Sequence, residues 1–271
     1  MKGRKITALP YILWCIAFTI IPLFLVVFFA FTTKDGNFTF NNLIKITSYG
    51  KIFLKSINLA LIATIICFLV GYPLAYMISR AEEKRQKTLL MLIMLPMWMN
   101  FLLRTYGWMT LLENEGLINK LAGLVGLGPF HMINTQGAVV LGMVYNYLPF
   151  MILPLYSIMV KIDKSIIEAA QDLGANNFHV IFRILMPLSL PGIISGITMV
   201  FVPSISTFVI SKLLGGGSNM LIGDLIEQQF LGTTYNPYLG SALSLVLMVI
   251  MLVIMGIINS IGEDEMEGML I

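Results

Sequence analysis

Few residues in this sequence have the type and spacing needed for covalent chemistry. Its two cysteines, Cys15 and Cys67, both lie inside apolar runs, where a buried small thiol is the ordinary interpretation. Its two histidines, His131 and His179, are far apart and have no cysteine near them, so no zinc site is predicted. No nucleophile–base set and no pair of carboxylates is spaced for catalysis. We therefore expect no catalytic residue, no bound metal and no cofactor.

A glycine run, Gly215–Gly217, invites comparison with a phosphate-binding loop. Such a loop places a lysine and then a serine or threonine directly after its last glycine. Here Ser218 and Asn219 follow instead. The chain is therefore expected to hold no nucleotide-binding loop of its own.

The most informative pattern lies in residues 161–187, a polar segment that carries its own helix signals. Ser165 and Glu168 have the spacing of a capping box, which predicts that a short helix starts at Ser165. Gly174 can end this helix in a left-handed conformation that a side chain would penalise.

A second short helix is predicted directly after that glycine. Either Asn176 or Asn177 can cap it, and it would run over 178–185. Pro187 is expected to stop it. The segment is thus predicted to be two short helices joined by a glycine.

The amino-acid composition shows which class of protein carries this segment. The chain has 271 residues, of which 58% are hydrophobic and 11% are charged, and its mean hydropathy is +0.88. Soluble domains are about 45–50% apolar and about 25% charged. This composition excludes a soluble enzyme, a nucleic-acid-binding protein and a disordered chain, and it predicts an all-α integral membrane protein.

Six stretches are long and apolar enough to cross a bilayer, which takes about 20 residues per helix. We expect them to form one membrane domain over residues 1–271, with no internal repeat. The predicted spans are about 11–31, 57–79, 88–108, 136–160, 188–212 and 237–262. The connection at 109–135 contains an apolar stretch, 117–127, that is predicted to lie along the membrane interface as a short helix.

Basic residues predict the orientation of these spans. Lys2, Arg4 and Lys5 precede the first span, and a dense basic cluster occupies 80–87 between the second and third spans. Basic residues of short connections stay on the cytoplasmic side. We expect a multi-pass protein of the cell membrane with both termini in the cytoplasm and the 161–187 segment on the same side.

The 161–187 segment resembles the EAA loop of ABC-importer permeases. The family form is Glu-Ala-Ala-x3-Gly-x9-Ile-x-Leu-Pro. The matching residues are Glu168, Ala169, Ala170, Gly174, Ile184 and Pro187. One position departs from the form, because Met186 stands where leucine is usual, and this swap of similar volume should cost little.

The resemblance implies a type I ABC-importer permease fold with a cytoplasmic coupling helix. In that family the short helix inserts into a groove of a separate ATPase subunit, so that closure of the ATPase dimer moves the membrane helices. Small Ala169 and Ala170 permit close approach, and Glu168 offers a charge. The alternative interpretation is an amphipathic linker helix that rests on the lipid headgroups.

Beyond this loop, nearly the whole chain resembles the first permease subunit of spermidine/putrescine importers. The stretches that carry this resemblance are 95–98, 103–108, 116–119, 148–156, 213–217 and 220–226. It implies four kinds of partner: a second, homologous permease, an ATPase dimer that binds the ATP, an extracellular polyamine-binding protein, and membrane lipid. No nucleic acid is expected. Some relatives carry an acid just before the glycine run, where this chain has Lys212, so a cation site at that position is in doubt.

A polyamine pathway needs carboxylates or aromatic faces for its ammonium groups. The predicted spans contain no acid before the inner end of the sixth, so aromatic rings are the candidates. Trp98 is the first choice, because it follows a proline and precedes Asn100 in mid-span, where a break and a polar group mark function. Asn100 itself, Tyr106 and Tyr145 are further candidates, although each aromatic is more often a packing or interfacial residue than a pathway residue.

The fifth predicted span combines two further features. Gly192 and Gly196 form a Gly-x-x-x-Gly step that allows close helix contact. Pro203 and Ser204 are expected to interrupt the helix near mid-membrane. Such interruptions usually line a cavity, so we place both residues in the pathway.

Arg104, near the outer end of the third span, has two interpretations. It can snorkel to the interface, or it can face inward and fix an outer gate by pairing with Glu113, Glu115 or the partner permease. Asp224 and Glu227 are the other candidates for this gate.

Two rival functions remain open. One is an importer of the same architecture for another solute, such as ferric iron, an aminoalkyl phosphonate or an opine. The other is a self-sufficient secondary transporter or channel, which would usually show intramembrane ionisable residues or an internal repeat.

Overall fold

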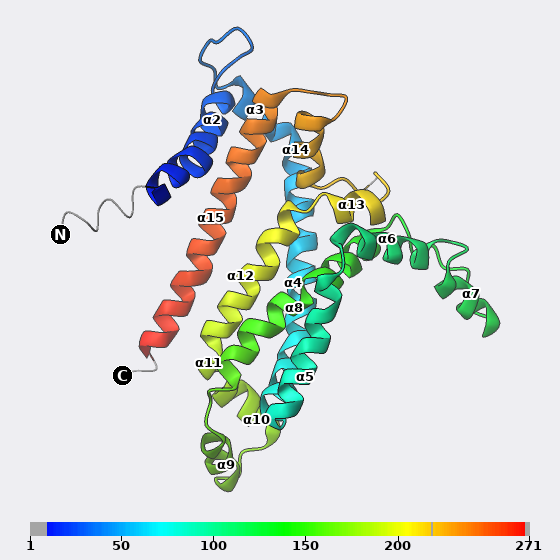
Figure 1. Cartoon of the computed structure of the whole chain (residues 1–271), viewed down its shortest axis with the longest axis vertical. Helices are drawn as coiled ribbons and strands as arrows, with labels where there is room; N and C mark the ends of the chain where they lie inside the picture. Colours follow the sequence, from blue (N-terminus) through cyan, green and yellow to red (C-terminus); the bar gives the residue numbers. More distant parts are fainter. Residues whose placement is uncertain (1–9, 218, 269–271) are drawn as a thin grey trace, which may run out of the picture. The chain divides into compact units, whose positions relative to one another are not determined.

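A computed structural model describes residues 10–217 and 219–268 (Figure 1). In these residues the secondary structure is helical, apart from an isolated bridge between Thr32 and Phe38. The chain forms two compact units, one of Met1–Phe53 with Leu225–Val253 and the other of Leu54–Asp224 with Ile254–Ile271. Three helices continue from one unit into the other: α4 (Gly50–Arg80), α14 (Ile222–Leu231) and α15 (Pro237–Gly268).

The smaller unit is built around a buried asparagine. It contains the π-helical turn η1 (Ile16–Ile20), α2 (Ile21–Ala30), α3 (Asn41–Ile46) and η2 (Thr47–Tyr49). The Asn42 amide nitrogen donates to the carbonyls of Ala30 at 3.2 Å and Thr32 at 3.0 Å. These bonds pair carbonyls that the end of α2 leaves without an intrahelical partner, and so tie α3 to that end.

The larger unit has its core between α4, α8 (Gln136–Met159) and α12 (Leu190–Ser206). Helices α8 and α12 approach closely at the predicted Gly-x-x-x-Gly step. A Cβ at Gly192 would lie 3.0 Å from the Pro154 carbonyl oxygen, and one at Gly196 would lie 2.7 Å from the Met151 sulfur. Side chains at these positions would force the helices apart, so the prediction of close contact is confirmed.

Four helical stretches in the described part of the chain are long and apolar enough to cross a membrane unbroken. They are Pro10–Ala30, Asn41–Arg80, Gln136–Met159 and Pro237–Ser260. Two further pairs pass the same test but are bent, by 88° between Glu83–Trp98 and Phe101–Leu124 and by 75° between Phe178–Leu188 and Leu190–Ser206. Counting each bent pair as one span gives the six spans expected, in the expected order.

The first bend confirms the break predicted around Trp98. Helix α5 (Glu83–Met94) tightens into the 3₁₀ turn η3 (Leu95–Trp98), and α6 (Phe101–Leu112) starts afresh after it. The side chain of Asn100 caps α6 by accepting from the backbone N–H groups of Leu102 at 2.8 Å and Leu103 at 3.4 Å. The polar residue therefore marks the break because it starts the next helix.

The helix predicted over 178–185 and expected to stop at Pro187 ends one residue later, at Leu188. Residues follow in the order α10 (Asn177–Val180), the π-helical turn η4 (Ile181–Leu185) and α11 (Met186–Leu188), and the bend comes later, before α12. Pro187 lies in the first turn of α11. Because α11 directly continues η4, the proline lies near the end of one helical stretch, Phe178–Leu188.

The interruption predicted at Pro203 is displaced along the chain. Pro203 lies inside α12, and the break falls at residues 207–208, before α13 (Val209–Leu214). The hydroxyls of Ser204 and Ser206 donate to the carbonyls of Val200 at 2.6 Å and Val202 at 3.1 Å. These extra bonds around the proline support the helix past it.

The apolar stretch at 117–127 forms the predicted helix, α7 (Leu117–Leu124). The buried Asn119 side chain fixes its connections by donating to the carbonyls of Glu113 at 3.2 Å and Phe130 at 2.9 Å, and by accepting from the Phe130 N–H at 2.8 Å. Its position along a membrane interface stays a prediction.

Candidate functional site

The 161–187 segment starts with a helix, α9 (Lys164–Asp172), whose cap differs from the prediction. Its N-cap is Asp163, and the carboxylate accepts from the Ser165 N–H at 3.0 Å. Ser165 therefore lies inside the helix, and the predicted capping box is wrong. This hydrogen bond is the main reason that the pKa of the Asp163 carboxyl is lowered, with a smaller contribution from the charge of Arg80. A carboxylate is a strong acceptor for the free N–H groups of a first turn.

Gly174 ends α9 in the left-handed conformation that the sequence predicts. Its φ is +87°, and the N–H groups of Leu173, Gly174 and Ala175 donate to carbonyls of the last turn of the helix, at 3.2, 2.9 and 3.0 Å respectively. No atom lies within 4 Å of a Cβ built at this position. Glycine is therefore needed here for its backbone conformation and not for lack of space.

Of the two asparagines proposed to cap the second helix, the structure selects Asn176. Its side-chain oxygen accepts from the His179 N–H at 2.9 Å, directly before α10. Ile184 and Pro187 follow in η4 and α11, and both side chains are half-buried. Ile184 and Pro187 therefore lie where the segment joins α12, and not on the exposed helix α9.

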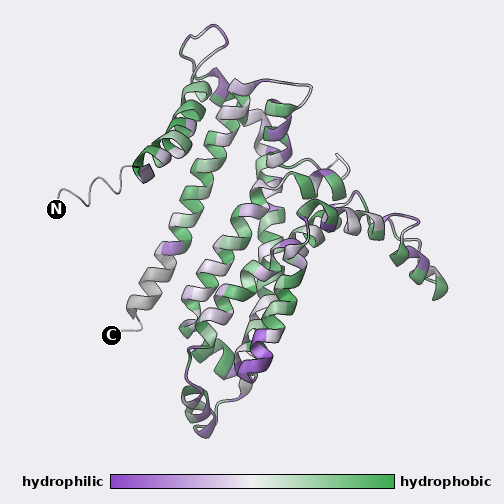
Figure 2. Ribbon diagram, in the orientation of Figure 1, coloured by the Kyte–Doolittle hydropathy of each residue, from purple (hydrophilic) through white to green (hydrophobic). Residues whose placement is uncertain are grey.

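The segment is held by a small apolar core of its own and leaves one face open. Ile167, Val180 and Leu185 form this core. Glu168 and Ala169 are exposed, and Leu173 is 90% exposed. Figure 2 shows hydrophilic residues gathered on α9 and at the start of α5, in contrast to the apolar helices that join them.

A shallow cavity of about 310 Å³ lies beside this surface. Ala170, Leu173, Gly174, Ala175 and His179 line this cavity. A leucine as exposed as Leu173, next to small alanines and a hollow, is a surface suited to contact with another protein. The structure thus brings Glu168, Ala169 and Gly174 together at the exposed side of this segment, with Ala170 half-buried beside them.

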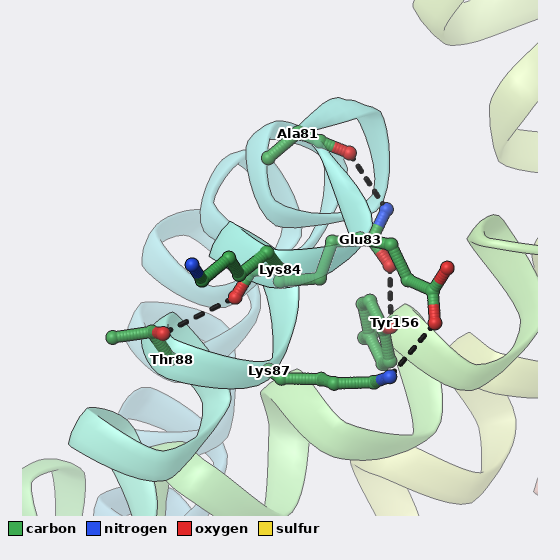
Figure 3. Close-up of polar contacts among 7 residues, drawn as sticks. Ala81, Glu83, Lys84, Lys87, Thr88 and Tyr156 are labelled. Atoms are coloured by element: carbon green, nitrogen blue, oxygen red, sulfur yellow. Dashed lines mark hydrogen bonds and ion pairs between the residues drawn. The ribbon is translucent and has the colours of Figure 1, made fainter.

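Sequence reasoning missed a set of polar contacts at the root of this segment. The Arg80 Nη1 donates to the Ile162 carbonyl at 3.1 Å, and Tyr156 donates its hydroxyl proton to the Gln86 side-chain oxygen at 2.9 Å. Figure 3 shows Tyr156 directed toward the first turns of α5, beside Glu83 and Lys87. Residues so far apart in the chain give no local sequence signal for such contacts.

The aromatic pathway candidates lie on both sides of the first bend. Trp98 is 72% exposed at the end of η3, and Tyr106 is 47% exposed on α6. Tyr145 on α8 packs edge-to-face on Trp108, with ring centroids 5.3 Å apart. The ring faces of Trp98 and Tyr106 are therefore available for contact, whereas Asn100 uses its oxygen to cap α6.

The two candidates in the fifth span are placed differently from each other. Pro203 is half-buried, and its carbonyl accepts from the Tyr147 hydroxyl at 3.4 Å. Ser204 is fully buried and donates to the Val200 carbonyl of its own helix. Their assignment to a pathway stays a prediction.

The gate candidates lie on α6, which carries Arg104, and on α14, which carries Asp224 and Glu227. The Arg104 guanidinium lies 6.0 Å from the Phe101 ring centroid, and within the described residues no ion pair joins it to Glu113 or Glu115. Asp224 is buried and accepts from the Leu221 N–H at 2.8 Å, at the start of α14. Glu227 is half-buried on the same helix.

Comparison with known proteins places this geometry in a family. Residues 68–262 match the family described as binding-protein-dependent transport system inner membrane components. The chain is 41% identical, over 92% of its length and 91% of the relative's, to the spermidine/putrescine transport system permease protein PotB of Haemophilus influenzae. It is 38% identical to PotB of Escherichia coli K12, over 88% of this chain and 90% of that protein.

Solved structures of low sequence identity share the fold. A chain of a bacterial ABC transporter that imports the acidic polysaccharide alginate matches with a TM-score of 0.81 at 18% identity, covering 96% of this chain and 94% of that one. A chain of the MetNI methionine ABC transporter matches with a TM-score of 0.58 at 16% identity, covering 80% and 95% respectively. The fold is that of type I ABC-importer permeases.

Proposed function

Because the chain belongs to the family of binding-protein-dependent transport system inner membrane components, we propose that it is the membrane-spanning permease subunit of an ATP-driven importer of polyamines. The observation that carries this proposal is the identity of 41% to a spermidine/putrescine permease, which extends over 92% of the chain. The exposed face of α9 supports it, because a permease without a nucleotide site must receive its energy through contact with another subunit.

The proposed assembly has several subunits. A second, homologous permease would complete the pathway, an ATPase dimer would bind and hydrolyse ATP, and a polyamine-binding protein outside the cell would deliver the substrate. The chain itself would be a non-catalytic subunit of the cell membrane, surrounded by lipid. Both termini and the 161–187 segment would face the cytoplasm, in agreement with the basic cluster at 80–87.

Residues 161–187 would be the contact with the ATPase. Leu173 and Ala169 supply an exposed apolar and small surface, and Glu168 adds a charge beside it. The small core of Ile167, Val180 and Leu185 holds that surface on the membrane helices. A movement imposed on α9 would therefore be passed on to α8 and α12, between which the segment is inserted.

The pathway would bind its substrate weakly and release it readily. Trp98 and Tyr106 offer exposed aromatic faces that attract ammonium groups. Few acids in the spans suit a permease that passes its substrate on, because a deep carboxylate site would retain a polycation. Selection between spermidine and putrescine would then rest mainly with the binding protein.

The test is uptake of radiolabelled spermidine and putrescine by cells with and without this chain. A variant of the ATPase subunit that cannot hydrolyse ATP is the control. We expect uptake of a polyamine to require both the chain and ATP hydrolysis. Unchanged uptake of both polyamines in the absence of the chain would contradict the proposed substrate and favour another solute, such as ferric iron, an aminoalkyl phosphonate or an opine. Uptake that needs the chain but not the ATPase would indicate a secondary transporter.

A further inference from the structure

Arg80 differs from the other basic residues of the 80–87 cluster. Lys84, Arg85 and Lys87 are exposed on α5 and are available to orient the protein in a membrane. Arg80, the last residue of α4, is half-buried and folds back over the Tyr76 ring, with its guanidinium carbon 5.6 Å from the ring centroid. Its side chain therefore has a role beyond that of an orienting charge.

The guanidinium of Arg80 contacts the short connection between α8 and α9. Its Nη1 donates to the Ile162 carbonyl at 3.1 Å. Its charge also helps to lower the pKa of the neighbouring Asp163 carboxyl, the residue that caps α9. One side chain at the end of α4 thus contacts the connection and acts electrostatically on the helix cap that follows it.

Arg80 also has hydrogen-bonding capacity to spare. Its Nε and Nη2 are shielded from solvent, and neither has a hydrogen-bond partner among the described residues. Leaving buried donors unpaired is unfavourable, so these two groups would donate to carbonyl oxygens of the connection if a movement brought any within reach.

Gln86 joins three helices with a single amide group. Its nitrogen donates to the carbonyls of Ser79 at 3.1 Å and Ala81 at 2.8 Å at the end of α4, and its oxygen accepts from Tyr156 on α8 at 2.9 Å. Gln86 itself lies on α5 and is half-buried between exposed neighbours. We name the set Arg80, Gln86 and Tyr156 the polar latch.

We propose that the polar latch is the positioning element that passes movement of α9 to the second and third spans. Through the chain alone, α9 is connected to α8 and to the α10–α12 stretch. The latch adds α4, through Arg80, and α5, through Gln86 and Tyr156. The second, third, fourth and fifth spans then move together when α9 is displaced. A pathway that must open along its whole length requires such a joint movement.

This inference rests on the proposed role of α9 as the contact with the ATPase. The assay is the purified importer reconstituted in liposomes with its partner permease, ATPase and binding protein, and it measures polyamine transported and ATP hydrolysed in the same sample. Three variants are compared: Arg80→Lys, which keeps the charge but loses the planar set of donors; Arg80→Ala; and Tyr156→Phe, which removes only the hydroxyl. The control is Glu83→Gln, which removes the exposed Glu83–Lys87 ion pair next to the latch.

We expect the latch variants to assemble and to hydrolyse ATP, with transport per ATP lowered between about twofold and thirtyfold, the range typical of residues within a coupling network. Arg80→Ala should have the largest effect, and Glu83→Gln should have none. The proposal is overturned if transport and ATP hydrolysis fall together in proportion to the amount of assembled importer, because that is the result of a purely structural role. It is also overturned if the ratio stays unchanged in all three variants. Cross-linking from α9 in the unmodified importer tests separately whether α9 contacts the ATPase. If it does not, the proposed role of α9 is refuted, and not the role of the polar latch alone.

Discussion

The backbone conformation of Gly174 allows a prediction with a matched control. Its φ of +87° is unfavourable for an L-amino acid, and no neighbouring atom would obstruct a side chain. Replacement by valine should therefore cost only conformational energy, about 1–2 kcal/mol for a side chain in the left-handed region. Asparagine tolerates this region far better than a β-branched residue. Gly174→Asn is therefore the control, because it adds a side chain at the same exposed position.

A penalty of that size lowers the population of the native turn roughly fivefold to thirtyfold relative to its competitors. We expect Gly174→Val to reduce polyamine uptake per molecule of permease in the membrane by up to this factor, and Gly174→Asn to reduce it much less. The assay is initial-rate uptake in cells, normalised to the amount of permease in isolated membranes. Equal losses in the two variants, or full uptake by Gly174→Val, would refute the argument that the turn conformation controls presentation of α9.

Three further changes have defined outcomes. Gly196→Leu should destabilise the α8–α12 contact by about 1–3 kcal/mol through overpacking against Met151. The thermal unfolding midpoint of the detergent-purified protein should fall accordingly. An unchanged midpoint would show that the two helices can move apart without loss of stability. Asn100→Ala should cost about 1 kcal/mol by removing the α6 cap, while Asn100→Asp should preserve it, and amide exchange in the first turn of α6 distinguishes the two. Because folding lowers the pKa of Asp163, its contribution to α9 should be complete above the unfolded-state pKa of about 4 and be lost as the pH falls through the lower folded value. Amide protection of α9 should therefore be flat from pH 6 to 8, and a decline within that range would contradict the capping role.

The pattern of apolar runs was sufficient to predict the long apolar helices and their order. An apolar run of about 20 residues has the length that a helix needs to cross a bilayer. The break after Trp98 was also predictable, because a proline and an asparagine close together combine a missing donor with a capping side chain. Asn100 caps α6 as such a residue should.

Local signals failed where two candidates of similar strength lay close together. Ser165 has the spacing of a capping box, yet Asp163 caps α9, since a carboxylate placed two residues earlier accepts the same kind of N–H bond. Pro203 marks a weak point of its helix, but serine hydroxyls beside it restore hydrogen bonding, and the chain breaks at residues 207–208 instead. Local sequence signals thus indicated the region of the helix cap and of the helix break. Competition between neighbouring residues for the same backbone hydrogen bonds decided the exact position.

The contacts of the polar latch could not be predicted from the sequence. Gln86 and Tyr156 are joined by one hydrogen bond between helices that are distant in the chain, and neither residue belongs to a recognisable motif. Arg80 was counted as an orienting charge because its burial depends on the fold of the 161–187 segment. Contacts of this kind follow from tertiary packing, which a single sequence without homologues does not reveal.

The central claim is that α9 is the surface through which an ATPase drives this permease, and site-specific photo-cross-linking tests it most directly. A photoreactive amino acid is placed at Leu173, which is 90% exposed on the 161–187 segment, or at Leu124, which is 84% exposed at the end of α7. The two positions have the same residue type and similar exposure, so they differ chiefly in location. The account predicts that position 173 captures the ATPase subunit and position 124 does not. Capture from position 124, or none from position 173 in an importer that hydrolyses ATP, would contradict it.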